Sequence, residues 1–88
     1  MGKTIYVVSY TSSYYDEIYN NVIAFDNIEG AIDSANSYLA EAKDKMREGF
    51  VLEKDFSHYK GGYQEIDVND NYSSITFLIS ISKFIFAQ

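Results

Sequence analysis

One histidine, no cysteine and a scatter of serines make up the chain's supply of residues for catalysis or metal binding. His58 titrates near neutrality, but a metal site needs several such ligands, and a nucleophilic triad needs a second group beside it. No serine lies in the Gly-x-Ser-x-Gly turn that exposes a nucleophile. The sequence therefore predicts no catalytic residue, no metal site and no cofactor.

Two patterns begin like ligand-binding motifs without completing them. Gly2-Lys3-Thr4 matches the end of a phosphate-binding loop, but the upstream glycine and the preceding strand are missing. Asp67–Asn71 begins like a calcium-binding loop, which needs glycine and glutamate where this chain has Tyr72 and Leu78. We expect a hairpin turn at this position, because Asn and Asp tolerate left-handed backbone conformations.

The segment 14–19, with the sequence Tyr-Tyr-Asp-Glu-Ile-Tyr, brings aromatic rings and carboxylates together in a predicted loop. Paired carboxylates act as acid and base in a water-poor cleft, which a small domain with one helix is poorly placed to form. Tyrosine offers a large contact area at a low entropy cost and is enriched in protein-binding surfaces. The segment therefore indicates protein binding rather than catalysis.

Half-buried positions in a sheet are the alternative explanation for the nine tyrosines. We expect this explanation to hold for Tyr6, Tyr10 and Tyr38. A binding role and a structural role stay equally open for Tyr14, Tyr15 and Tyr19.

Thirteen acidic residues against seven basic ones give a net charge of −6. Bare nucleic acid is disfavoured as a partner, because phosphate contacts require lysine and arginine. The acidic surface could face a basic partner or serve only to solvate the domain. No apolar run has the length of a signal peptide or a membrane span. We therefore expect a cytoplasmic, soluble protein that does not bind membranes.

A single amphipathic helix, expected over residues 27–48, is the clearest element of the chain. Asp26 and Glu29 have the spacing of a capping box, cations follow in the last turns, and Gly49 suits the helix end. Apolar residues recur at a period near 3.6. They are Ile28, Ala31, Ile32, Ala35, Tyr38, Leu39, Ala42 and Met46.

Strand-like segments flank this helix on both sides. Runs rich in β-branched and aromatic residues predict strands at 4–10 and 19–25 before the helix, and at 50–56, 63–68 and 72–86 after it. The apolar phase of the last segment shifts at Phe84, which indicates a bulge or a bend. The expected fold is one α+β domain over residues 1–88. It is a two-layer sandwich with the helix on an antiparallel sheet of four to five strands, in the order strand–strand–helix–strand–strand–strand.

The first half of the chain resembles small accessory proteins of phages and mobile elements from low-GC bacteria. The likeness rests on Thr4–Tyr10, Asn21–Phe25 and the helix opening Asp26-Asn27-Ile28-Glu29, and on short length, acidity and the lack of cysteine and proline. Proteins of this type often inhibit host defence nucleases, anti-CRISPR proteins among them, and some imitate DNA by presenting carboxylates in place of phosphates. The resemblance carries no catalytic residue and implies a phage-encoded anti-defence role.

The leading hypothesis is a non-catalytic inhibitor that binds a host protein with a basic surface, such as a nuclease or a nucleic-acid-binding complex. Carboxylates would pair with lysines and arginines of this partner, and tyrosines would anchor the apolar centre of the contact. Such an association is expected to be sensitive to salt. The candidate contacts are Tyr14, Tyr15, Asp16, Glu17, Tyr19, Glu29 and Asp33.

Two other classes of function stay open. A small-ligand protein, such as a sponge for a nucleotide signal, would need a pocket near Gly61-Gly62 or between two protomers. Its cationic contacts would have to come from Lys54, Lys60 and Lys83. A structural homodimer or virion component would form if the strand over 72–86 lay at a sheet edge and paired across a two-fold axis.

Overall fold

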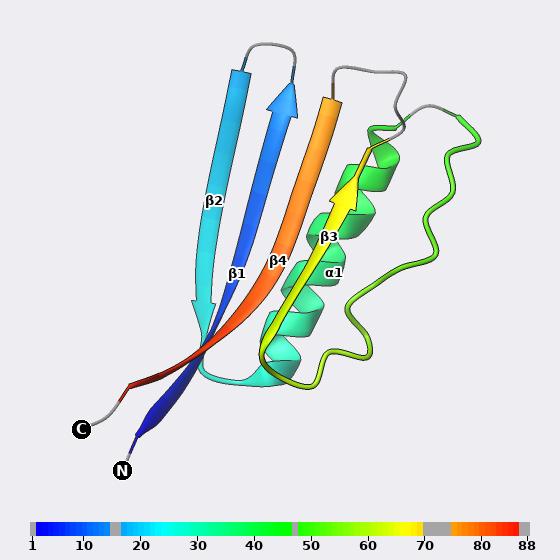
Figure 1. Ribbon diagram of the computed structural model, residues 1–88. Coiled ribbons are helices and arrows are strands. Elements are labelled where there is room, and N and C mark those ends of the chain that lie inside the picture. Colours follow the sequence, from blue (N-terminus) through cyan, green and yellow to red (C-terminus); the bar gives the residue numbers. More distant parts are fainter. Residues whose placement is uncertain (1, 15–16, 47, 70–74, 87–88) are drawn as a thin grey trace.

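The computed structural model describes residues 2–14, 17–46, 48–69 and 75–86. The elements along them are β1 (Lys3–Tyr14), β2 (Glu17–Phe25), α1 (Ile28–Asp44), β3 (Tyr63–Val68) and β4 (Ile75–Phe86). The strands form an antiparallel sheet in the order β2-β1-β4-β3, and α1 lies across one face of it (Figure 1). The expected α+β class, with a helix on an antiparallel sheet, is confirmed. The predicted element order is wrong in one position, because one strand fewer follows the helix.

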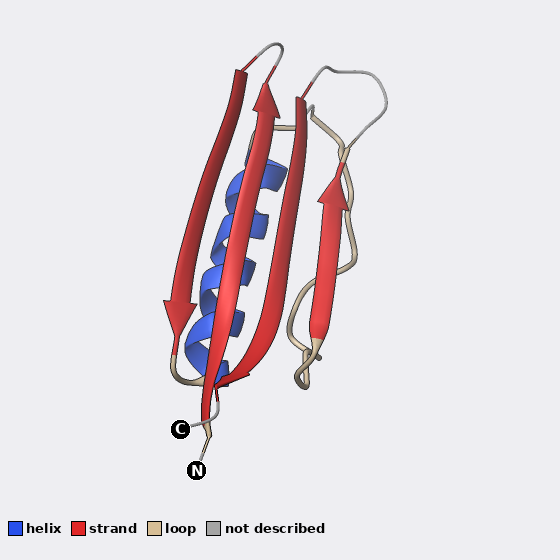
Figure 2. Ribbon diagram, turned by 60° about the vertical axis from the view of Figure 1, so that its left-hand side comes forward, coloured by secondary structure: helices blue, strands red, loops and turns tan. Residues whose placement is uncertain are grey.

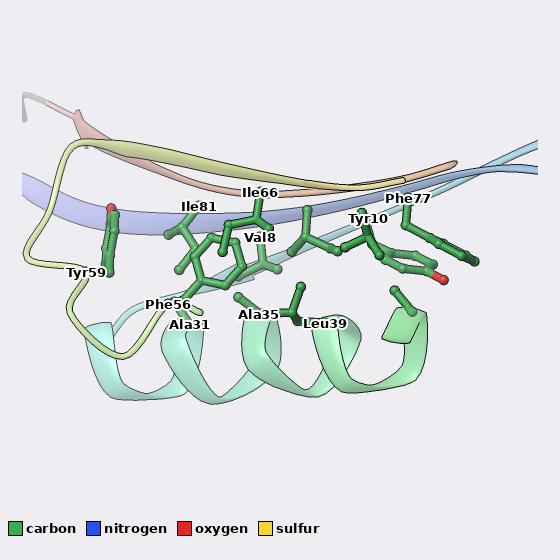
Figure 3. Packing of buried hydrophobic residues seen from close by; sticks show 13 residues of the cluster. Val8, Tyr10, Ala31, Ala35, Leu39, Phe56, Tyr59, Ile66, Phe77 and Ile81 are labelled. Carbon is green, nitrogen blue, oxygen red and sulfur yellow. The ribbon is translucent and has the colours of Figure 1, made fainter. Parts of the chain in front are cut away.

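The core lies between α1 and the sheet (Figure 3). The strands contribute Val8, Tyr10, Ile66, Val68, Phe77, Ile79 and Ile81 to it. The helix contributes Ala31, Ala35, Leu39 and Ala42, all of which belong to the predicted apolar stripe. Because three of these four helical residues are alanines, the helix leaves room for the larger side chains of the strands.

The N-terminal end of α1 depends on a cap that differs from the expected one. The side chain of Asn27, not Asp26, accepts a hydrogen bond of 2.6 Å from the backbone N–H of Gly30 and so caps the helix. A Cβ atom on Gly30 would lie 2.9 Å from Asn27 Oδ1 and 3.0 Å from Phe25 Cδ1. This close approach explains a glycine in the first turn, where it otherwise weakens a helix.

The C-terminal end of α1 comes earlier than expected. Lys45 is the C-cap and donates its backbone N–H to the carbonyl of Ala42, so the helix stops at Asp44 rather than at residue 48. Gly49 has a φ of +85° but lies in a turn beyond the helix. In the part of the chain that the structure describes, no helix has the length and apolar character needed to cross a membrane.

Packing, rather than strand pairing, holds the connection between α1 and β3. The strand predicted over 50–56 is wrong: these residues have no regular secondary structure up to the bend at Phe56. The backbone N–H of Phe56 donates to Asn36 Oδ1 at 2.9 Å, and the Tyr59 hydroxyl donates to the Gly62 carbonyl at 2.8 Å. Both rings are buried beside α1 (Figure 3). Phe56, one of the apolar residues that suggested a strand, is therefore an anchor of an irregular segment.

β4 is an inner strand with an uninterrupted register against β1. The pairing runs from Lys3 opposite Phe86 to Tyr14 opposite Ile75, so the strands have no bulge, and β4 instead curves toward its end (Figure 1). The pairing with β3 begins only at Ser82. The last residues of β4 therefore extend past the core, and burial does not determine which of their side chains are apolar. Because β4 lies between β1 and β3, it is not an edge strand, so the condition for pairing through this strand across a two-fold axis is not met.

Replacing Phe56 with alanine is expected to lower the free energy of unfolding by about 3–5 kcal/mol, because removal of a fully buried ring leaves a cavity. The control Val51→Ala changes a 75% exposed side chain of the same connection and is expected to cost less than about 0.5 kcal/mol. Urea denaturation followed by circular dichroism measures both. Equal effects of the two substitutions would show that Phe56 does not anchor the connection.

Candidate protein-binding surface

The hairpin of β1 and β2 extends into the segment that was expected to be a loop. Tyr14 lies opposite Glu17 in the last pair of the ladder, so the loop prediction is wrong for both residues. The residues before Tyr14 are serine, threonine and tyrosine, which a strand accepts as readily as a loop does. Tyr15 and Asp16 lie outside the described residues. Glu17 is exposed at the start of β2.

Tyr10, Tyr19 and Tyr38 form what we call the tyrosine cluster, beside the C-terminal half of α1. Tyr10 stacks on Tyr38 with ring centroids 4.6 Å apart and meets Tyr19 edge-on at 6.5 Å. The side-chain amide of Asn21 donates to the Tyr38 hydroxyl at 2.6 Å. Tyr6 is half-buried in the sheet, as predicted, whereas Tyr10 is fully buried, and Tyr38 is half-buried on α1 instead of in the sheet. Tyr19 is 60% exposed, so it packs on the cluster and still presents a free edge.

The hydroxyl of Tyr10 is buried and has no hydrogen-bond partner within the described ranges. Burial raises the pKa of Tyr10, and the carboxylate of Glu41 and the neighbouring tyrosines raise it further. Lys45 closes this end of α1, with Nζ 3.4 Å from Glu41 Oε1 and 5.7 Å from the centroid of the Phe77 ring. The tyrosine cluster is therefore an uncharged end of the core. Because the pKa of Tyr10 is raised, this residue is a poor proton donor at neutral pH.

The outward side of α1 carries a row of acidic side chains. The carboxylates of the helix are exposed and, at about 100° per residue, lie within an arc of about 120° opposite the buried alanines. Lys45 forms an ion pair with Glu41, and the other acids of the row form none with a described residue. We call this row, with the exposed acid just before the helix, the acidic face. It consists of Asp26, Glu29, Asp33, Glu41 and Asp44.

The acidic face spreads the predicted contacts over a long strip rather than one patch. α1 starts where β2 ends and runs back toward the hairpin end (Figure 1). At about 3.3 Å per strand residue, Glu29 and Glu17 are separated by roughly 25 Å along the sheet. Sequence reasoning missed Glu41 and Asp44, which lie nearer to the hairpin end. Their position on the same helical face as Asp33 was the signal that could have found them.

A cavity of about 380 Å³ lies where β1 begins and β2 ends, next to the start of α1. Its lining residues are Lys3, Ile5, Ala24, Phe25 and Asp26. This place differs from the pocket considered at Gly61-Gly62, which lies beside β3 at the opposite edge of the sheet. Over the described ranges, no group of three or more His, Asp or Glu residues is placed to hold a metal ion.

Comparison of the chain with protein-family models, curated proteins and solved structures finds no match. The chain's own surfaces therefore carry the functional argument. The two that bear on it are the acidic face, in which Glu41 is paired with Lys45 and the other acids form no ion pair with a described residue, and the tyrosine cluster, with the exposed edge of Tyr19.

The substitution Tyr10→Phe is expected to raise the free energy of unfolding at pH 7 by up to about 1 kcal/mol, because it removes a buried hydroxyl without a partner. The control Tyr38→Phe removes the acceptor of the Asn21 amide and is expected to cost about 1 kcal/mol. Urea denaturation measures both, and a loss of stability from Tyr10→Phe equal to that from Tyr38→Phe would contradict the assignment.

The variant Tyr10→Phe gives a second measurement at alkaline pH. The pKa of Tyr10 is raised in the folded state, so the unfolded chain loses this proton first, and stability falls as the pH rises above about 10. Tyr10→Phe is expected to make this fall shallower, whereas Tyr59, whose pKa is also raised by burial, still contributes to it. Identical pH profiles for the wild type and Tyr10→Phe would show that Tyr10 does not titrate differently on unfolding.

Proposed function

We propose that the protein is a non-catalytic inhibitor that binds the basic, nucleic-acid-binding surface of a host nuclease complex, as phage-encoded anti-defence proteins do. The acidic face of α1 is the observation that carries this proposal. It presents Glu29, Asp33 and Asp44 to solvent, and none of the three forms an ion pair with a residue that the structure describes. A row of unpaired carboxylates favours a partner rich in lysine and arginine and disfavours nucleic acid itself.

The helix gives this row a fixed geometry. Residues three or four apart on one helical face are about 5–6 Å apart, so the acidic side chains form two pairs, Glu29 with Asp33 and Glu41 with Asp44. A gap of about 12 Å along the helix separates Asp33 from Glu41. From Glu29 to Asp44 the row is about 22 Å long at 1.5 Å per residue. A surface that binds the phosphates of a nucleic-acid backbone recognises such a row of charge, and a rigid helix presents it at a low entropy cost.

The hairpin end supplies an apolar contact next to the negative one. Tyr19 exposes its edge beside the C-terminal half of α1, where Glu41 and Asp44 lie, and Glu17 starts the same strand. Tyrosines held by a packed core lose little entropy on binding and suit the centre of an interface. In this proposal Tyr19 anchors the partner and the acids surround the anchor.

The same arrangement supports a role without catalysis. The acidic side chains stand on the convex surface of α1 in contact with water, whereas general acid–base catalysis needs a carboxyl group in a water-poor cleft. Histidine 58 lies exposed in the connection before β3, away from the acidic face. Neither position combines a nucleophile with a base.

The test is inhibition of a panel of purified bacterial nucleases, RNA-guided and restriction enzymes, each cutting its own DNA. At least one is expected to be inhibited in competition with DNA, and its affinity for the protein is expected to fall as salt rises. The double variant Glu29→Gln/Asp33→Asn is expected to bind that nuclease about three- to thirtyfold more weakly, because two exposed charge pairs are lost.

The control Glu48→Gln/Glu53→Gln removes the same net charge from exposed positions outside the acidic face and is expected to keep the affinity of the wild type. Equal weakening of binding by both double variants would show that the net charge of the protein, and not the acidic face, determines the affinity. Inhibition that neither salt nor DNA opposes would contradict the proposal.

A further inference from the structure

The two edges of the sheet are protected to different degrees. β3 is short, carries the exposed acids Glu65 and Asp67, and has the 45–62 connection along its outer side, where Gln64 Nε2 donates to the Asp55 carbonyl at 3.1 Å (Figures 1 and 2). Short length, charge and a covering segment are the devices by which proteins prevent a sheet edge from pairing with another chain.

β2 has none of these devices. It has nine residues, of which Glu17 at its start is the single charged one, and it contains neither lysine nor proline. Its pairing with β1 runs from Tyr6 opposite Phe25 to Tyr14 opposite Glu17 without a bulge. Both views show its outer side free of any described segment (Figures 1 and 2).

The side chains of β2 are also unusually apolar for an exposed edge. Ile18 and Val22, on the sheet face opposite α1, are 71% and 62% exposed, and Tyr19 is exposed on the helical side. Four acids lie on α1, on the side of the helix that faces away from the sheet. A regular, nine-residue edge with one charged residue, in a chain of net charge −6, is a surface suited to another strand of low charge.

We propose that β2 pairs with β2 of a second copy of this chain, antiparallel across a two-fold axis, to form one continuous eight-stranded sheet. The register that uses all nine residues is centred on Asn21. It sets Tyr19 opposite Ile23 of the second copy, which is an aromatic–β-branched pair, and Asn20 opposite Val22.

This register avoids like charges facing each other across the interface. Glu17 lies opposite Phe25 of the second copy, so the two glutamates are at opposite ends of the interface and never face each other. An antiparallel pair of nine residues forms about nine backbone hydrogen bonds, which is close to the number in a typical protein interface. Because the other edge is covered at β3, the assembly closes at two copies instead of growing into a fibre.

The proposed dimer carries both helices on the same side of the sheet. A two-fold axis between antiparallel strands is perpendicular to the sheet, so the two acidic faces point the same way. Each copy has a net charge of −6, and the repulsion between copies is screened by salt. Dimerisation is therefore expected to strengthen as salt rises, in contrast to binding at the acidic face, which is expected to weaken.

Sedimentation equilibrium of the full chain tests the proposal. The wild type is expected to be a dimer with a lower dissociation constant at high salt than at low salt. The variants Asn20→Lys/Val22→Lys and Asn20→Glu/Val22→Glu each place like charges opposite one another twice, and each is expected to dimerise at least about tenfold more weakly. An equimolar mixture of the two variants is expected to form heterodimers, which also shows that both variants fold.

The matched control is Tyr63→Lys/Phe84→Lys, which adds two lysines to exposed positions on the same sheet face but away from β2. It is expected to dimerise like the wild type. A wild type that stays monomeric up to millimolar concentration would overturn the proposal. So would variants of β2 that keep the dimer, a mixture of folded variants that does not associate, or a control that loses the dimer, since this last result would assign the contact to the sheet face.

Discussion

One helix has to cover four strands, and it is too narrow to do so. An α-helix with its side chains is about 10–12 Å wide, whereas the axes of four neighbouring strands span about 14 Å before side chains are added. α1 packs mainly on β1 and β4, over Val8, Ile79 and Ile81. The rest of this sheet face needs other cover. The 45–62 connection covers this face beside β3, whereas Tyr19 of β2 stays exposed.

Because α1 covers only one face of the sheet, the two sides of the molecule differ in charge. Positions that face the core must be apolar, so the acids of α1 are confined to its outward side, where they form the acidic face. The opposite face of the sheet has no helix over it and carries mainly serine, threonine and apolar residues on β1, β2 and β4, whereas β3 adds the exposed acids Glu65 and Asp67 at its edge. The molecule therefore offers a negative surface on α1 and, in the opposite direction, a surface with little charge over β2, β1 and β4, and each suits a different kind of contact.

Features that depend on neighbouring residues could be predicted from the sequence, whereas features that depend on the pairing of distant segments could not. The stripe of α1 was predictable because helical periodicity is a property of neighbouring residues, and Glu29 and Asp33 followed from it. Phe56 was misread, since an apolar residue that anchors a loop looks the same in sequence as one in a strand. The tyrosine cluster joins β1, β2 and α1. It depends on a register that no local pattern contains.

The central pair of strands has a kinetic consequence. β1 can form its hairpin with β2 as soon as both exist, whereas its other neighbour, β4, is the last element of the chain. Closing that pair brings together residues at opposite ends of the described chain, which makes it the slow step of assembly. Until then the hairpin and α1 stand alone, with both edges of the hairpin unpaired. A chain in which this pair has not yet closed exposes unpaired strand edges that the finished protein covers, and such edges favour association with other chains.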